Sequence, residues 1–448
     1  MASFRITTFG CKVNQCDSQI IRETLTLWGL TEAAPSATRP ARTEHGEETG
    51  GETGPGGPDL VVINTCTVTG TADAKFRKAL RRIKRENPRA LTAVTGCFAS
   101  RVDLSPKESP GANLVFRMRD FSALADFLYQ NGIMAAGAAE AAGGQSYFAE
   151  HTRAFLKIQD GCDCFCTYCI VPAVRPRLWS EEPDRIVEAI NTLSSKGYSE
   201  VVLAGIHLGF FGRDTGRNAL AQLLRRIEAE CEIGRVRLSS IEINEVSEEM
   251  LELIAGSKKF CRHLHMPLQS GDGEILQRMG RRYSAASFLS RVGEIRRRIP
   301  DIGLTTDLMT GFPGETDEQF ERTLQAVEHM GFAKIHVFRF SPRPGTKAAE
   351  MGARLPAATI SSRARRLISL GEKVARKFKE RFIGQTLCVL AEKRDSNRSS
   401  CIGYSSNYIN VKVLGASADR VNRILPVRLT GIDAKTGIAE GRLVENTN

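Results

Sequence analysis

The sequence predicts an α/β protein in three parts: an N-terminal open parallel α/β sheet, a central partial (β/α)6 barrel and a C-terminal small antiparallel β-barrel. Three observations predict this. Strand-like apolar runs alternate with helical runs through most of the chain, short strands among Gly, Ser and Asn replace them near residue 382, and 448 residues exceed one ordinary domain. We expect domains at 1–133, 146–381 and 382–448.

The first part reads as alternating strands and helices. The expected strands are Phe4–Phe9, Leu60–Asn64 and Leu91–Thr95, and the expected helices are Gln19–Leu27 and Ala74–Arg85. A stretch at about 32–58 has almost no large apolar residues and predicts a disordered surface insertion. The small-residue run Met134–Gln145 predicts a linker to the second part.

A cysteine directly follows each of the three strands of this part. These are Cys11, Cys66 and Cys97. The carboxyl ends of parallel strands meet at one edge of a sheet, which is where ligands bind in open α/β folds. The three thiols can therefore converge on one metal centre. The alternative is that they are small buried packing residues.

The second part contains six strand-like runs separated by helical ones. The expected strands are Phe155–Ile158, Val201–Ala204, Val236–Ile241, His263–Pro267, Leu304–Met309 and Ile335–Phe340. In (β/α) barrels the chemistry lies at the C-terminal ends of the strands. A cysteine-rich loop at 160–169 falls at such an end. In the third part, Leu387–Leu390, Tyr408–Val413 and Val427–Leu429 predict the small β-barrel, of the oligonucleotide-binding type.

Composition limits the classes of protein that fit. No stretch approaches the roughly 18 consecutive apolar residues of a membrane span, and the N-terminus lacks a secretory apolar run, so we expect a cytoplasmic protein without a membrane partner. Twelve cysteines in that compartment favour metal ligation over disulfides. The formal net charge is +11, and basic residues gather in Lys75–Arg89 and Ser361–Phe382. These segments are either solvated helix faces or a phosphate-binding surface.

The segment Asp160–Ile170, DGCDCFCTYCI, is the motif most specific for chemistry. Its thiols Cys162, Cys166 and Cys169 are spaced CxxxCxxC, which suits an iron–sulfur cluster with one iron free of protein ligands. The amino and carboxylate groups of S-adenosylmethionine (SAM) can chelate that iron. Tyr168 stands where an aromatic commonly packs against the adenine. A structural zinc site is the alternative, with Cys164 as a fourth ligand.

Several motifs in order resemble a known family. They include FGCKVNQCDS, VINTCTVTGTADAKFRKALRR, TGCFAS, FLKIQDGCDCFCTYCIVP, VVLAGIHLGFFG, HLHMPLQSGD, TTDLMTGFPGETDEQF and IHVFRFSPRPGT, and together they are similar to the radical SAM methylthiotransferases. The resemblance covers nearly the whole chain. Segments such as GCKVNQ, AGIHLG and GYSSNYINVKV are most similar to the MtaB type.

The resemblance implies a function. Enzymes of the MtaB type convert threonylcarbamoyladenosine at position 37 of tRNA, adjacent to the anticodon, to its 2-methylthio derivative. It implies two [4Fe-4S] clusters, one on Cys162, Cys166 and Cys169 as the catalytic set and a second on Cys11, Cys66 and Cys97. SAM is the methyl donor and the radical source. The C-terminal barrel becomes a TRAM domain that binds RNA.

Further SAM contacts are expected from strand-end position alone. The candidates are Gly205, which permits close backbone approach, and the polar residues Ser239, Glu242, Gln269 and Asp307. Each could equally be a structural cap or a core hydrogen-bonding group. His207, His263, His265 and His336 are interpreted as structural barrel residues. In the C-terminal barrel, Tyr404 and Tyr408 are interpreted as core residues, with stacking on RNA bases as the alternative.

The chain departs from the family after the cysteine loop. The family pattern RGxxRSR is here Arg175–Glu181, RPRLWSE, so that Trp179 and Glu181 replace two basic residues. Cys16 replaces a usual aromatic. None of these changes removes an expected cluster ligand.

Partners and rival functions follow from the same resemblance. The expected partners are tRNA, an electron donor such as flavodoxin or ferredoxin, and a sulfur source, with a monomer as the default state. One rival is a sister methylthiotransferase acting on isopentenyladenosine in tRNA or on a ribosomal protein. A rival of another class is a non-catalytic Fe–S RNA-binding redox sensor, which would not cleave SAM.

Overall fold

The computed structural model describes residues 1–33, 57–101, 109, 111–118, 120–135, 147–148, 152–217, 219–395 and 399–444. The predicted insertion at 32–58 and linker at 134–145 lie largely outside these residues. The chain forms two compact units, Met1–Tyr147 with Ala173–Arg175, and Phe148–Pro172 with Pro176–Asn448. The boundaries of three domains remain a prediction.

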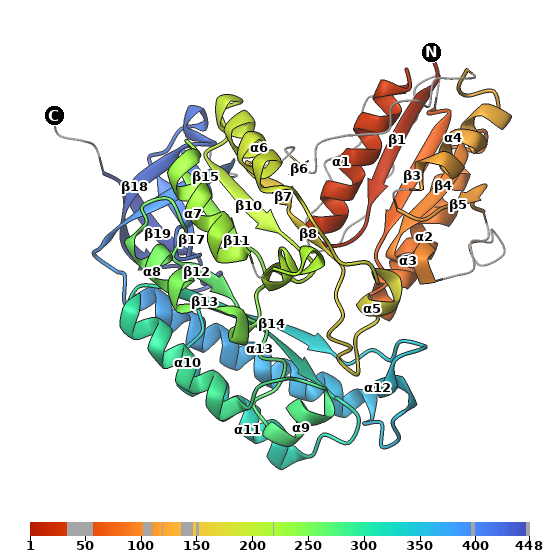
Figure 1. Cartoon of the computed structure of the whole chain (residues 1–448). Coiled ribbons are helices and arrows are strands. Elements are labelled where there is room, and N and C mark those ends of the chain that lie inside the picture. The colour runs from red at the N-terminus through yellow and green to blue at the C-terminus, as the bar shows by residue number, and fades with distance from the viewer. Residues whose placement is uncertain are drawn as a thin grey trace. The chain divides into compact units, whose positions relative to one another are not determined.

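The first unit contains the predicted open parallel sheet (Figure 1). Its strand order is β2-β1-β3-β4-β5, with β1 at Ser3–Thr8, β2 at Thr31–Glu32, β3 at Leu60–Thr65, β4 at Leu91–Gly96 and β5 at Leu114–Val115. The helices are α1 (Lys12–Leu27), α2 (Gly70–Glu86), α3 (Cys97–Arg101) and α4 (Phe121–Gln130). Strand β3 is buried throughout, as expected of a central parallel strand with helices on both faces.

Helix α2 is the basic helix that the sequence predicts. Phe76, Leu80 and Ile83 are buried against the sheet, while its basic side chains are mostly exposed. Thr69 caps its N-terminus by accepting a hydrogen bond from the Ala72 amide at 3.2 Å. The apolar stripe therefore fixes the helix on the sheet and directs the positive charges outward.

The second unit contains six parallel barrel strands at the predicted places. They are β7 (Arg153–Lys157), β10 (Glu200–Ala204), β11 (Arg235–Leu238), β12 (His263–His265), β13 (Gly303–Thr310) and β14 (Lys334–Arg339). These strands form two hydrogen-bonded sheets, β11-β10-β7-β6 and β12-β13-β14. Isolated parallel β-bridges, Val236 with Phe260 and Ser240 with His265, connect β11 and the residues after it to the segment that contains β12. Short strands β6 (Tyr147–Phe148), β8 (Gln159–Asp160) and β9 (Trp179–Ser180) flank the series. The partial (β/α)6 barrel is thus confirmed.

Helices α6 (Pro183–Ser195), α7 (Leu220–Glu230), α8 (Glu248–Gly256), α10 (Ala285–Arg298) and α11 (Asp317–Met330) lie between successive barrel strands in the sequence and along the outside of the row (Figure 1). The shorter helices are α5 (Val171–Val174), α9 (Gly273–Arg278) and α12 (Lys347–Glu350), and the long helix α13 (Ala357–Glu380) follows the last barrel strand. Several starts carry the side-chain caps typical of helix N-termini, for example Thr316 before α11 with Gln319 completing a capping box. Helix α13 packs along β14 and also contacts the C-terminal part of the chain.

The C-terminal part is a closed five-stranded barrel, in the order β15-β16-β17-β19-β18. The strands are β15 (Thr386–Arg394), β16 (Ser400–Ser405), β17 (Asn410–Leu414), β18 (Ile424–Ile432) and β19 (Ala439–Leu443). Most pairs are antiparallel as predicted, but β17 and β19 run parallel. Such a pair closes the barrel and leaves no free sheet edge, which the sequence pattern alone did not indicate.

Two buried arginines join this barrel to the N-terminal ends of the larger barrel's strands. Both pair with Glu200, Arg235 at 2.6 Å and Arg237 at 2.8 Å. Arg235 also donates to the carbonyl oxygens of Cys388 and Tyr404, and Arg237 to those of Ser405 and Ser406. The tyrosines that could have stacked on RNA, Tyr404 and Tyr408, stack on each other 4.8 Å apart, with the Arg153 and Arg237 guanidiniums over their rings. They serve here as packing residues.

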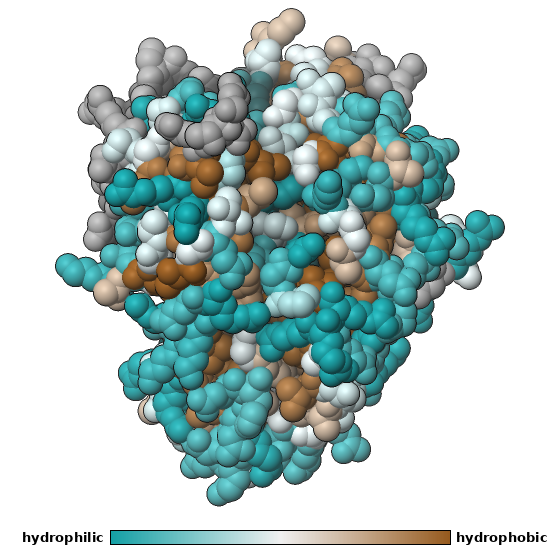
Figure 2. All heavy atoms as spheres, turned by 90° about the vertical axis from the view of Figure 1, so that its left-hand side faces the viewer, coloured by the Kyte–Doolittle hydropathy of each residue, from teal (hydrophilic) through white to brown (hydrophobic). Residues whose placement is uncertain are grey.

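The face that carries the C-terminal barrel is mostly hydrophilic, with apolar residues in small separate areas (Figure 2). Among the described helices, none combines the length and apolar character needed to cross a membrane.

Candidate functional site

The cysteine loop follows β8 at the C-terminal end of the first barrel strand. Gly161, which opens the loop, has a φ of +81°, and a Cβ placed there would lie 2.1 Å from the Arg177 carbonyl oxygen. Only glycine fits this close approach. Farther along, the Thr167 amide donates to the Met279 carbonyl oxygen, and the Thr167 carbonyl oxygen accepts from the Ala348 amide. The loop is therefore held from both sides.

One group in the loop brings three ligand atoms close together. The Sγ atoms of Cys162 and Cys164 each lie 3.5 Å from Nδ1 of His207, and the three atoms lie within 4.8 Å of one another. The hydrogen bond from Cys164 lowers the pKa of Cys162. Cys164 thus supports the thiolate form of the neighbouring Cys162.

His207 is fixed on three sides. Its Nε2 lies 2.6 Å from Oε1 of Glu245, its amide donates to Oε1 of Gln159 at 2.8 Å, and its ring stacks on Phe210 at 3.7 Å. Burial alone would lower the pKa of His207, but its bonds to Cys164 and Glu245 raise it to about 9. A cationic imidazole beside thiolates favours their charged form.

A second cation faces Cys166. The Arg281 Nη1 lies 3.4 Å from Sγ of Cys166, and the same guanidinium pairs with Glu242. Its Nε donates to the Tyr283 hydroxyl, which in turn donates to the Pro267 carbonyl oxygen at 2.6 Å. Burial raises the pKa of Cys166, and the Arg281 charge opposes that rise. The arginine is thus placed to offset negative charge at this sulfur.

Cys169 and Tyr168 lie at the more apolar end of the loop. Burial raises the pKa of Cys169 to about 11. Tyr168 is partly buried and packs with Met309, Phe340 and Met351 against an apolar cluster around Phe312. Tyr168 therefore presents an aromatic ring beside the thiols, in a position suited to packing against a planar ligand.

Two of the five expected SAM contacts have features of an incomplete site. The Ser239 side chain is buried, and within the described residues its hydroxyl has no hydrogen-bond partner. Gln269 has a φ of +68°, an unusual backbone conformation for a residue other than glycine, at the level where β13 ends. An unpaired buried hydroxyl fits a polar ligand that completes its hydrogen bonding.

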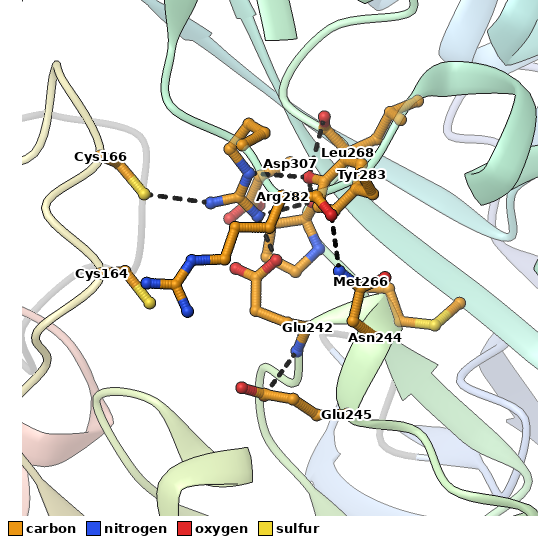
Figure 3. A network of polar contacts seen from close by, with 12 residues as sticks. Cys164, Cys166, Glu242, Asn244, Glu245, Met266, Leu268, Arg282, Tyr283 and Asp307 are labelled. Carbon is orange, nitrogen blue, oxygen red and sulfur yellow. Dashed lines mark hydrogen bonds and ion pairs between the residues drawn. The ribbon is translucent and has the colours of Figure 1, made fainter. Parts of the chain in front are cut away.

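The other three expected contacts have protein partners. A Cβ on Gly205 would lie 3.1 Å from the Gln159 side chain, so it is Gln159 that approaches the Gly205 backbone closely. Glu242 pairs with Arg281, and Asp307 lies 3.3 Å from Nε2 of His265. His265 and His263 both contact the Thr305 hydroxyl, as expected for structural histidines. Figure 3 shows that Glu242 and Asp307 nevertheless lie on the side of the barrel that faces Cys164 and Cys166.

In the first unit, the cysteines after β1, β3 and β4 come together. The pKa of Cys66 is raised to about 11. Burial is the largest cause, and the nearby charges of Cys97 and Cys11 also raise it. A Cβ on Gly10 would lie 3.1 Å from Cβ of Cys66, so the loops of Cys11 and Cys66 touch. The strand-end argument therefore places three thiols in one neighbourhood, as an iron–sulfur cluster requires.

Two buried asparagines hold these loops. The Asn14 side chain accepts a 3.3 Å hydrogen bond from the Cys11 thiol and donates to Oδ1 of Asn64 and to the Thr65 carbonyl oxygen, each at 3.1 Å. Asn64 donates back to the Asn14 carbonyl oxygen at 2.8 Å. Gly96 must be glycine because a Cβ would lie 2.4 Å from both Oδ1 of Asn64 and the Thr65 carbonyl oxygen.

Arg175 is a functional candidate that sequence reasoning missed. It belongs to the first unit, where its Nε lies 3.4 Å from Sγ of Cys97 and its Nη2 pairs with the fully buried Asp17 at 2.7 Å. Its position at the start of the RGxxRSR-like segment was the available signal. Trp179, which replaces a basic residue of the family pattern, has its ring centroid 5.9 Å from Nζ of the buried Lys157.

Comparison with known proteins gives consistent results. Residues 156–327 match the radical SAM superfamily, and residues 46–116 match the uncharacterized protein family UPF0004. The chain is 34% identical to the threonylcarbamoyladenosine tRNA methylthiotransferase MtaB of Bacillus subtilis, over 96% of this chain and 94% of that protein. The MtaB of Thermotoga maritima is 33% identical over 99% of each chain.

Relatives named for another substrate are nearly as similar. A tRNA-2-methylthio-N(6)-dimethylallyladenosine synthase of Pelotomaculum thermopropionicum is 32% identical over 96% of each chain. Among solved structures, the radical SAM methyltransferase TsrM of Kitasatospora setae, with cobalamin and a [4Fe-4S] cluster bound, superposes with a TM-score of 0.53 at 15% identity, covering 78% of this chain and 77% of that one. This likeness shows the fold.

Proposed function

Because the chain belongs to the radical SAM methylthiotransferase family, as a tRNA-modifying enzyme of the MtaB type, we propose that its substrate is threonylcarbamoyladenosine at position 37 of tRNA. The product is the 2-methylthio derivative. The observation that carries the proposal is near-full-length identity of 33–34% to three relatives that bear this substrate in their names. The second candidate substrate is the dimethylallyl (isopentenyl) adenosine of the sister enzymes.

Two [4Fe-4S] clusters belong to this proposal. Cys162, Cys166 and Cys169 would hold one, and Cys11, Cys66 and Cys97 the other. The first would bind SAM and supply the electron that cleaves it, which is the chemistry needed to replace hydrogen on an aromatic carbon. The residues present fit these groups, since each set offers three thiols, and near the first lies the buried hydroxyl of Ser239, which has no hydrogen-bond partner in the described part of the chain.

The surrounding side chains have definable tasks in this proposal. Arg281 and His207 place positive charge beside Cys166 and Cys162, which offsets the negative charge of a thiolate-bound cluster. Tyr168 would pack against the adenine of SAM. Glu242, which pairs with Arg281, keeps that guanidinium oriented. Arg175 has the corresponding position beside Cys97 in the first unit.

The remaining parts of the proposal concern organisation. We assign 1–133 to the methylthiotransferase domain, 146–381 to the radical SAM domain and 382–448 to the TRAM domain. An electron donor of the flavodoxin or ferredoxin class and a source of sulfur are required by the chemistry. We place the enzyme in the cytoplasm, where tRNA is available and reduced iron–sulfur clusters are maintained. We propose that it is a monomer.

The test is mass spectrometry of nucleosides from bulk tRNA. A host strain lacking its own gene for this modification would be complemented with wild type, with Cys162→Ala or with the control Cys231→Ala, a buried cysteine that belongs to neither set. The 2-methylthio derivative of threonylcarbamoyladenosine is expected with wild type and Cys231→Ala and absent with Cys162→Ala. If the isopentenyl analogue changes instead, the second candidate replaces the first. If no tRNA nucleoside changes with iron-loaded wild type, the tRNA assignment fails.

A further inference from the structure

A basic groove lies at the end of the barrel opposite to the cysteine loop. It is a cavity of about 560 Å³ bounded by α13, the start of β14 and the turn between β18 and β19. One acidic side chain, Glu372, lines it. Its basic lining residues, which define the groove here, are Lys334, Lys373, Arg376, Lys379 and Lys435.

The cations come from three elements that are tied to one another. Gly371 lets α13 approach β14, because a Cβ there would already touch the Ile335 side chain at 3.4 Å. Nζ of Lys379 donates to the Gly437 carbonyl oxygen at 2.6 Å, which attaches the helix to the turn. Thr436 donates through its amide to Oδ1 of Asp433 at 2.7 Å and closes that turn around Lys435. The groove is therefore formed before any ligand arrives.

Its positive charge is only partly compensated by the protein. Burial and then the charges of Lys334 and Arg376 lower the pKa of Lys379. Arg376 has an acidic partner, Glu380 at 3.2 Å, but this pair is exposed and contributes little. A concave surface with excess charge of one sign concentrates ions of the opposite sign. The groove is thus suited to a ligand with closely spaced negative charges.

We propose that the basic groove binds backbone phosphates of the tRNA substrate at a distance from the modified base. This rests on the proposed function. Strand β14 begins in the groove at Lys334, and its residue Phe338 pairs with Met309, which packs against the same apolar cluster as Tyr168. Four strand residues span about 13 Å, so the groove lies about that far along β14 from the level of this cluster. Lysine-rich contacts of this kind position an RNA without reading its sequence.

The experiment measures the affinity of cluster-loaded full-length enzyme for two RNAs at several salt concentrations. One is a whole tRNA, and the other is a hairpin with only the target loop and a few base pairs. The variant is K373Q/R376Q. The matched control is R365Q/K377Q, which removes the same charges from exposed positions of α13 outside the groove. Thermal melting and iron content verify that each protein is folded and loaded.

For whole tRNA, K373Q/R376Q is expected to weaken binding about tenfold and to reduce the salt dependence by about two counterions, and the hairpin should bind nearly as to wild type. The control should retain wild-type values for both RNAs. Equal losses in variant and control would show a general charge effect and overturn the proposal, as would unchanged binding in the variant or equal losses for both RNAs. If wild type itself fails to bind or modify tRNA, the proposed function fails instead.

Discussion

Nε2 of His207 lies 2.6 Å from Oε1 of Glu245, while Nδ1 of the same ring lies 3.5 Å from Sγ of Cys162. The Glu245 carboxylate, 38 residues after His207 in the sequence, thus orients the imidazole toward an expected cluster ligand. Hydrogen bonds to cysteine sulfurs are one determinant of the reduction potential of an iron–sulfur cluster. The pair is therefore a candidate for tuning the radical cluster.

The first prediction concerns that potential. His207→Phe removes the N–H group facing Cys162 and is expected to lower the midpoint potential of the cluster, because the reduced form loses a stabilising hydrogen bond. Glu245→Gln should produce a smaller shift in the same direction. Redox titration followed by electron paramagnetic resonance measures both. The exposed His329→Phe is the control, and an unaltered midpoint in His207→Phe would contradict the assignment.

The second prediction separates ligands from neighbours among the loop cysteines. Replacing Cys162, Cys166 or Cys169 with Ala should remove roughly half of the iron and acid-labile sulfide of the reconstituted enzyme, since one of two clusters is lost. Cys164→Ala should retain both. Iron and sulfide analysis decides the matter. Loss in Cys164→Ala as large as in Cys166→Ala would make Cys164 a ligand and restore the four-thiol alternative.

The third prediction concerns the buried pair of Arg175 and Asp17. Arg175→Ala leaves the Asp17 carboxylate fully buried without its 2.7 Å partner. Removing one member of a buried ion pair costs about 3–5 kcal/mol, so the free energy of unfolding of the first unit should fall by that amount. Hydrogen exchange of its amides measures the change. Arg177→Ala, at an exposed position two residues away, is the matched control and should change it by less than about 0.5 kcal/mol.

The fourth prediction concerns acid stability. Burial would raise the pKa of Glu200, but the charges of Arg237 and Arg235 overcome this and lower it from 4.5 to about 2. A carboxyl with a depressed pKa contributes its stabilisation fully above pH 4.5, and this is lost as the pH falls toward 2. The contribution is about 3 kcal/mol by linkage.

Urea denaturation between pH 7 and pH 2 tests this. Wild type should lose stability across the window from 4.5 to 2, whereas Glu200→Gln should be less stable at pH 7 and should lack this component of the pH dependence. The exposed Glu328→Gln should follow wild type. A Glu200→Gln profile parallel to wild type would show that Glu200 does not titrate in this way.

Much of the fold was predictable because it depends on local patterns. The six barrel strands and the buried face of α2 follow from short apolar runs and helical periodicity. The parallel pairing of β17 with β19 was not predictable, because it depends on how a barrel closes rather than on either strand's sequence.

The candidate site could be derived from the sequence only where spacing carries information, and the roles of these cysteines as cluster ligands stay predictions. Spacing groups Cys162, Cys166 and Cys169, and strand ends group Cys11, Cys66 and Cys97. The partners that position them come from distant parts of the chain and have no local signal. Examples are Glu245 on His207, Arg281 on Cys166 and Arg175 on Cys97. The basic groove likewise depends on Lys334 and Lys435, which are far apart in sequence.

The pairing of Glu200 with Arg235 and Arg237 has a consequence for how substrates are chosen. Because these arginines also donate to carbonyl oxygens of the C-terminal barrel, buried contacts join the two barrels within one compact unit. The interval between the basic groove and the cysteine loop is then a fixed length. Under the proposal that the groove binds tRNA phosphates, an RNA would be accepted when its phosphates and its target base are spaced to that length, and the enzyme would select by this spacing before any base is read.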